Sequence, residues 1–168
     1  MQIIVISQNE LILYAYGSRS FNAVLRSPCH VGKNGLTYNK TEGDLCTPKG
    51  VFNISSAFGI APNPGTSLRY INIGQNTYLV DDPRSKYYNK IIEKDENADF
   101  RSGEHMIEFE KEYLYGMVID HNPKCIKGKG SGIFLHCGES CTRGCVAVPK
   151  RVMKELLIRA DKDTIIVI

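Results

Sequence analysis

Short apolar runs that stop at glycine, proline or asparagine recur along the chain, and they limit its fold more than any other feature. Runs rich in β-branched and aromatic residues and bounded by turns are typical of β-strands. We expect strands at residues 2–7, 11–16, 20–30, 51–54, 68–73, 113–120, 131–136 and 164–168, the first two forming a hairpin. The composition of residues 32–50 predicts a loop. Residues 81–104 form a long polar segment for which no single structure is predicted.

One segment near the end of the chain has helical spacing. Apolar residues recur there at Val152, Met153, Leu156, Leu157 and Ala160. Pro149 stands just before them, and proline suits the first position of a helix because its missing N–H would have no partner there. The chain is therefore predicted to be mainly β, with many short strands and few helices.

The composition is that of a globular protein. Of the 168 residues, 42% are hydrophobic and 23% are charged, which excludes a disordered or collagen-like chain. No repeat or linker divides the sequence, so we expect a single domain over residues 1–168. No apolar stretch approaches the roughly 18 residues that a membrane span needs, so no such span is expected.

Charge and targeting signals restrict the partners only partly. With 21 basic and 18 acidic residues the net charge is +3, and no dense basic stripe of the kind that binds nucleic acid is present. The chain opens on the strand-like residues 1–6 without a visible secretory signal. Six cysteines are many for a cytosolic protein and few for a disulfide scaffold, so the compartment stays open.

The segment from Gly130 to Pro149 holds the residue types that carry chemistry. His136 ends a predicted buried strand, and Cys145 follows nine positions later across a polar turn, so the two side chains are able to meet. A neighbouring imidazole shifts a thiol toward the thiolate, which is the nucleophilic form. Because Gly144 has no Cβ, the N–H groups of residues 143–145 are able to converge as an oxyanion hole.

The same residues permit two other interpretations. Cys137, Cys141 and Cys145 recur every four residues and, with His136, would make a zinc site, but the spacing matches no common zinc motif. The thiols are alternatively small buried side chains without chemistry. From the residues alone, cysteine catalysis, a metal site and a structural role all remain open. Of these we favour cysteine catalysis, and we therefore predict no metal and no cofactor.

The motifs resemble those of one enzyme family, the L,D-transpeptidase catalytic domain with the YkuD-type fold. The family pattern of a His, a short insert and [Ser/Thr]-x-Gly-Cys-[Val/Ile] is matched by His136 and by residues 142–146. Residues 42–52 (EGDLCTPKGVF) resemble the turn Glu-Gly-Asp-x-x-Thr-Pro-x-Gly-x-Phe, and residues 81–89 and 102–105 also resemble one branch of the family. The resemblance covers about residues 32–150.

The resemblance implies a β-sandwich of short mixed strands, with one helix after the cysteine, that acts on peptidoglycan stem peptides. Cys145 would attack a donor tetrapeptide after its third, dibasic residue, and His136 would move the protons. An acceptor amine would then take the acyl group from the thioester to give a 3→3 cross-link. The family also implies inhibition by carbapenems and a place in the periplasm or cell wall.

Water as the acceptor would instead make the protein an L,D-carboxypeptidase. Another Cys–His amide hydrolase and a non-catalytic metal-binding or redox module are the remaining alternatives. The resemblance further implies that a backbone carbonyl, here that of Cys137, orients the histidine.

This sequence departs from the family pattern at two positions. Arg143 replaces a second histidine found in many members, and we expect it to meet a substrate carboxylate beside Thr142. Cys137 leaves room for a disulfide with Cys141 or Cys145. Two other histidines, His105 and His121, are alternative bases.

Overall fold

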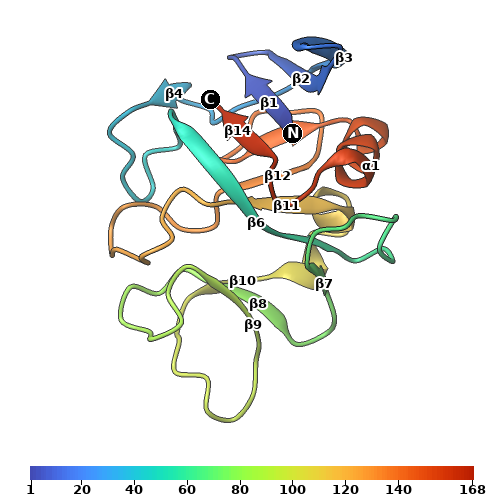
Figure 1. Cartoon of the computed structure of the whole chain (residues 1–168). Coiled ribbons are helices and arrows are strands. Elements are labelled where there is room, and N and C mark those ends of the chain that lie inside the picture. Colours follow the sequence, from blue (N-terminus) through green and yellow to red (C-terminus); the bar gives the residue numbers. More distant parts are fainter.

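Most strands of the protein join one large, bent sheet, seen in Figure 1 in a computed structural model that describes residues 1–168. Its strands lie in the order β13 (Val146–Val148), β12 (Phe134–Cys137), β11 (Gly116–Ile119), β6 (Val51–Gly59), β14 (Ile165–Val167), β1 (Gln2–Ile6), β2 (Glu10–Gly17) and β3 (Ser20–Pro28). β7 (Tyr70–Asn72) pairs with β6 outside this path. The prediction of a mainly β chain is confirmed.

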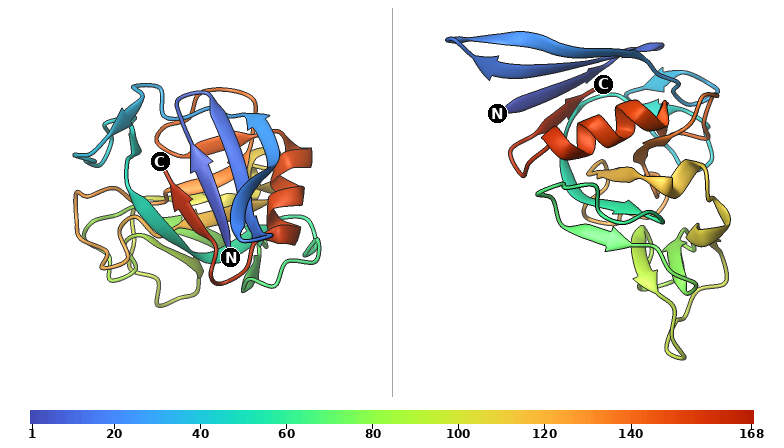
Figure 2. Two further views of the ribbon diagram at one scale, coloured as in Figure 1. Left: turned by 45° about the horizontal axis from the view of Figure 1, so that its top comes forward. Right: turned by 90° about the vertical axis from the view of Figure 1, so that its right-hand side faces the viewer.

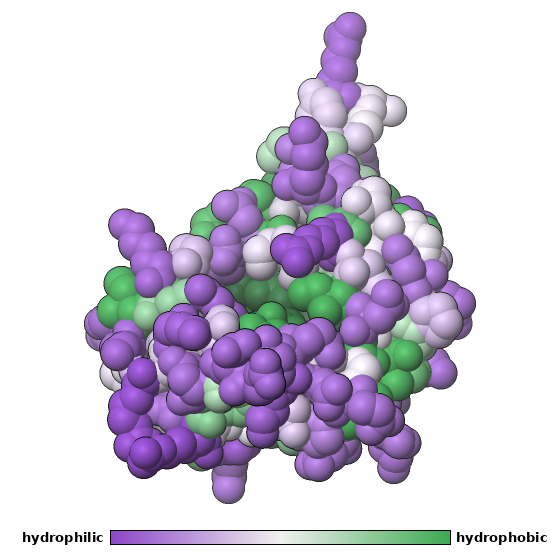
Figure 3. All heavy atoms as spheres, turned by 90° about the horizontal axis from the view of Figure 1, so that it is seen from below, coloured by the Kyte–Doolittle hydropathy of each residue, from purple (hydrophilic) through white to green (hydrophobic).

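Two smaller sheets flank the large one. β10 (Gly103–His105), β8 (Thr77–Val80) and β9 (Lys90–Glu93) form an antiparallel sheet at the bottom of Figure 1. β4 (Leu36–Thr37) and β5 (Thr47–Pro48) form a short parallel pair. The 3₁₀ turns η1 (Met106–Glu108) and η2 (Glu112–Leu114) precede β11. From below, the surface is mostly hydrophilic around one apolar hollow (Figure 3).

The predicted opening hairpin is present as the antiparallel pair β1–β2, in which Ile4 lies opposite Leu13. The last strand, β14, runs parallel to β1 and pairs Ile166 with Ile4, so the first and last strands of the chain lie side by side (Figure 2). All three of these side chains are buried in the larger of two apolar clusters. Burial therefore accounts for the strongly apolar character of both termini.

The helix α1 (Lys150–Arg159) begins one residue later than predicted, with Pro149 as its N-cap. The ψ angle of Pro149 is 143°, which is extended, so the helical conformation starts at Lys150. Met153, Leu156 and Leu157 are fully buried and turn one face of the helix to the core, as the spacing predicts. In Figure 2 the helix lies beneath the β1–β3 strands. No helix has the length and apolar character that crossing a membrane requires.

β12 is buried on both faces, so each of its side chains has surroundings that the rest of the protein provides. Leu135 and Cys137 pack into the larger cluster, on the side of α1. Phe134 points the other way, into a smaller cluster that includes Phe58 and Tyr113. Since side chains alternate along a strand, His136 shares the face of Phe134.

Candidate active site

Pairing between β12 and β13 brings Cys145 and His136 to the same face of the sheet. The parallel register sets Leu135 beside Val146 and His136 beside Ala147, so Cys145 falls next to Phe134. Both side chains line one cavity of about 690 Å³. The sequence predicted that the short turn lets these two side chains meet, and the structure places both on the same cavity.

The imidazole of His136 is oriented by the main chain. Its Nδ1 lies 2.7 Å from the carbonyl oxygen of Cys137, and because a carbonyl only accepts, Nδ1 carries the proton. Burial lowers the pKa of His136, whose residue is 7% exposed, so the ring is neutral near pH 7. Nε2 is thus the unprotonated nitrogen. The ring of Tyr113 packs edge-on against it, with 5.8 Å between centroids.

The thiol of Cys145 is hydrogen-bonded to the backbone of the preceding loop and strand. It donates to the carbonyl oxygen of Gly132 (3.1 Å) and accepts from the N–H of Phe134 (3.3 Å). Burial raises its pKa to about 12, so the resting group is a neutral thiol. This differs from the expected shift toward a thiolate, because desolvation outweighs the favourable neighbours.

The turn before Cys145 is held by Thr142. Its hydroxyl donates to the carbonyl oxygen of Cys145 (2.6 Å) and accepts from the N–H of Gly144 (3.1 Å). Gly144 has a φ of +143°, in the region that favours glycine. The N–H of Gly144, expected to help form an oxyanion hole, is therefore directed at Thr142 instead.

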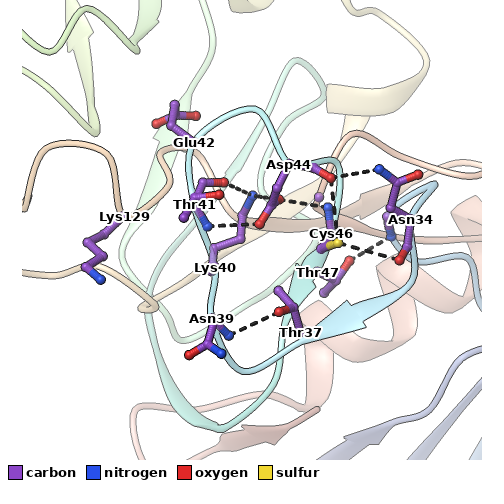
Figure 4. A network of polar contacts seen from close by, with 12 residues as sticks. Asn34, Thr37, Asn39, Lys40, Thr41, Glu42, Asp44, Cys46, Thr47 and Lys129 are labelled. Atoms are coloured by element: carbon purple, nitrogen blue, oxygen red, sulfur yellow. Dashed lines mark hydrogen bonds and ion pairs between the residues drawn. The ribbon is translucent and has the colours of Figure 1, made fainter.

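A partly buried cluster of charged and polar groups supports this turn from the loop before β5 (Figure 4). The carboxylate of Asp44 accepts from Lys40 Nζ (2.5 Å) and from the N–H groups of Thr41 and Cys46 (both 2.9 Å). Burial alone would raise the pKa of Asp44, but these hydrogen bonds outweigh it and hold the pKa below its usual value. Lys40 is 5% exposed, and its ammonium also donates to the carbonyl of Thr41 (2.9 Å).

This loop also contacts Cys145 directly. Thr47 donates a hydrogen bond from its hydroxyl to the carbonyl oxygen of Cys145 (3.0 Å). A Cβ on Gly144 would lie 3.6 Å from Lys40 Nζ and 3.1 Å from the carbonyl oxygen of Cys46. Thr47 stands within one of the family-like motifs, but no role was predicted from the sequence for Thr47 or Lys40. Lys40 and Asp44 lie in a loop, where a spacing of four residues does not by itself predict an ion pair, so no local pattern revealed this contact.

Arg143 and Glu104 stand where a second cavity, of about 100 Å³, meets the first at Cys145. Arg143 is exposed and forms no ion pair in the structure. The hydroxyl of Tyr113 donates to Glu104 Oε2 (2.5 Å). Neither Glu104 nor Tyr113 was singled out from the sequence as a site residue.

The other candidates lie elsewhere or have structural partners. The buried thiol of Cys137 donates to the carbonyl oxygen of Tyr115 (3.6 Å), and all six cysteines are free. No three His, Cys, Asp or Glu side chains gather as a metal site would require. The alternative bases are bound to other carbonyls, His105 to that of Gln75 and His121 to that of Lys129. Neither lines a cavity with Cys145.

Comparisons with known proteins agree with this fold. No curated protein matches the chain by sequence. Among solved structures, the helical cell shape determining protein Pgp2 of Campylobacter jejuni matches with a TM-score of 0.56 and 16% identity, over 99% of this chain and 46% of Pgp2. Bd1075 of Bdellovibrio bacteriovorus matches with a TM-score of 0.52 and 18% identity, over 99% of this chain and 47% of Bd1075.

The chain spans about half the length of these two proteins, and at such low identity the likeness shows the fold alone. The family comparison is more specific. The model of the L,D-transpeptidase catalytic domain, YkuD, matches residues 1–168. The chain therefore belongs to the YkuD family of L,D-transpeptidase catalytic domains.

Proposed function

We propose that the protein is a cysteine acyltransferase that forms 3→3 cross-links between peptidoglycan stem peptides through a thioester on Cys145. One observation carries the proposal. The Nδ1 of His136 donates its hydrogen bond to the carbonyl oxygen of Cys137, so Nε2 is the basic nitrogen. His136 and Cys145 line the same cavity. A neutral imidazole beside a neutral thiol is the pair that general-base catalysis requires at the start of the reaction.

In the first half-reaction, Nε2 of His136 takes the thiol proton as Sγ of Cys145 attacks the carbonyl after the third stem residue. The bond to Gly132 breaks as the thiol turns. The resulting imidazolium then protonates the amine of the departing D-residue, which leaves the acyl group on sulfur. Because burial raises the pKa of Cys145, we expect His136 to take the thiol proton as attack begins, without a preformed thiolate.

The developing oxyanion needs hydrogen-bond donors. Since the N–H of Gly144 is used by Thr142, we assign this role to the main-chain N–H groups of Arg143 and Cys145. The ammonium of Lys40 adds a positive charge behind the turn and favours the anionic form of Cys145.

The charges around the larger cavity suit a zwitterionic peptide. Cations and carboxylates alternate there: Lys111, Arg143 and Lys150 against Glu104, Glu110, Glu112 and Glu139. A stem peptide with a dibasic third residue carries both signs of charge and would find partners for each. We assign the free guanidinium of Arg143 to a substrate carboxylate.

The proposed substrate places the enzyme in the periplasm or cell wall, where peptidoglycan lies. Pgp2, which shares the fold, is described as determining helical cell shape. We propose that cross-linking by this protein likewise contributes to cell shape.

The test is a reaction of the purified chain with disaccharide tetrapeptides, followed by mass spectrometry. Transfer predicts loss of the terminal D-residue and appearance of 3→3 dimers. Tripeptides without dimers would show an L,D-carboxypeptidase and overturn the proposed transfer. The Cys145→Ala variant is the control, and product formation by that variant would overturn the nucleophile.

A further inference from the structure

Glu104 occupies the boundary between the two cavities that meet at the nucleophile. It lies on β10, an edge strand of the small sheet, opposite Leu79 of β8. Its side chain lines both the cavity of about 690 Å³ and the cavity of about 100 Å³, and Cys145 and Arg143 do the same. A molecule that reaches the acylated cysteine from the junction therefore passes this carboxylate.

The carboxylate is held in place by one oxygen only. Oε2 of Glu104 accepts from the hydroxyl of Tyr113 (2.5 Å), and Oε1 accepts no hydrogen bond from the protein. Tyr113 itself is fixed by aromatic contacts, 5.5 Å from the ring of Phe58 and 5.8 Å from that of His136. Glu104 is thus positioned through the same ring that packs against the proposed base, with one oxygen left for a ligand.

The surroundings of Glu104 make it a stronger base than an exposed glutamate. Burial raises its pKa, and the like charge of Asp81 raises it further. The hydrogen bond from Tyr113 and the guanidinium of Arg143 oppose this effect without cancelling it. A carboxylate whose pKa is displaced toward neutrality is suited to accept a proton from a substrate.

In the second half-reaction the acceptor loses one proton more than His136 transfers. An amine with a pKa of about 10 is an ammonium at neutral pH, with three N–H protons, whereas the amide product keeps one. Two protons must therefore leave the acceptor. His136 takes one and passes it to the departing sulfur of Cys145, which accounts for only one of them.

We propose, building on the function above, that Glu104 binds the acceptor ammonium and removes its first proton. The ammonium donates to Oε1, its proton passes to the carboxylate, and the neutral amine attacks the thioester carbonyl. The carbon–sulfur bond breaks as the amide forms, His136 transfers the second proton to sulfur, and Glu104 releases its proton to water. Hydrolysis needs no such step, because water arrives uncharged.

The test compares products of Glu104→Gln with those of the wild type. Glutamine keeps an oxygen to accept from Tyr113 but takes no proton, so the ratio of dimers to tripeptides should fall by about tenfold or more. Formation of the acyl-enzyme, followed by intact mass, should fall far less than the dimers do. Glu96→Gln is the matched control, because Glu96 is an exposed carboxylate that lines neither cavity and should keep the wild-type ratio.

Two further variants separate proton transfer from a structural role. Tyr113→Phe removes a hydrogen bond that favours the charged carboxylate, so the acid limb of the transfer rate should move to higher pH. Asp81→Asn removes a like charge and should move that limb to lower pH. Shifts of opposite sign are not expected from a loss of packing, and melting temperatures would confirm that both variants fold.

The outcomes distinguish this inference from the function on which it rests. A wild-type reaction without dimers would count against the proposed transfer before any variant is compared. Dimers formed by the wild type and by Glu104→Gln in equal ratio to tripeptides would overturn the role of Glu104 alone. An equal loss of acylation, dimers and tripeptides would show that Glu104 only shapes the site, and would overturn the inference too.

Discussion

Thr47 donates its hydroxyl proton to the carbonyl oxygen of Cys145 across 3.0 Å, although 98 residues separate the two in the chain. Thr142 donates to the same oxygen at 2.6 Å. The oxygen of Thr47 in turn accepts from the N–H of Gly32 at 2.7 Å. The backbone of Cys145, the proposed nucleophile, is therefore fixed from two segments, each of which carries a threonine of the family pattern.

Thr47→Val should destabilise the protein and slow acylation. Valine has the same shape, but it leaves the N–H of Gly32 without its acceptor in a buried place, which costs about 1–3 kcal/mol. Chemical denaturation measures the change. Thr41→Val is the control, because the exposed hydroxyl of Thr41 makes no hydrogen bond within the protein. Equal stability of the two variants would contradict the support that we assign to Thr47.

Gly144→Ala should abolish the correct placement of the thiol. Its Cβ would lie 3.1 Å from the carbonyl oxygen of Cys46 at a φ of +143°, so the turn has to shift. A displacement near 1 Å at a reacting group lowers rates by about a hundredfold. Gly65→Ala, also at positive φ (+107°) but with open space around its Cβ, should share the backbone strain and keep the activity. Acylation kinetics of both variants decide the point.

His136→Ala should slow acylation by about 10²–10⁴-fold, the usual contribution of a general base. In the wild type, burial lowers the pKa of His136, so the neutral form persists to lower pH than in a free imidazole. The pH at which acylation slows on acidification should therefore lie below about 6.5, which is the pKa of an unperturbed imidazole, unless another group sets it. His121→Ala, in a separate cavity, should leave the rate near that of the wild type. A fully active His136→Ala variant would exclude it as the base.

Cys145→Ala should remove turnover and covalent inhibition together while the fold persists. A carbapenem ring opens through the same attack and the same oxyanion as the peptide bond, so one inhibitor mass should attach to the wild type. Digestion should map that mass to Cys145, and intact-protein mass spectrometry should find none on the variant. Five other thiols are present, so adducts spread over several cysteines would show only general thiol reactivity.

Elements with a local signal in the sequence were predicted well. The hairpin of β1 and β2 and the helix α1 have apolar periodicities that their own packing explains. The small sheet was missed because β8 and β9 acquire their structure from pairing with each other, as at Leu79 and Ile91, within a polar segment. The run at residues 51–54 continues to Gly59 as β6 for a similar reason, since β11 and β14 pair along it.

For the site, the family motif located Cys145 and His136, but it did not reveal their neighbours. The neutral thiol, the buried ammonium of Lys40 and the junction at Glu104 depend on burial by distant segments. No local pattern contains that information. Glu104 did stand in a quoted motif, next to His105, but its contact with Tyr113 exists only in the folded chain.

The burial of β12 on both faces also determines how the site moves. Amide protons of a strand enclosed in this way exchange with solvent only when the surrounding sheet opens, so their exchange should be among the slowest in the molecule. The imidazole of His136 is therefore carried by a strand that opens only together with the surrounding sheet. Arg143 and Glu139 lie on the exposed rim of the cavity, where the sequence can change without disturbing this strand.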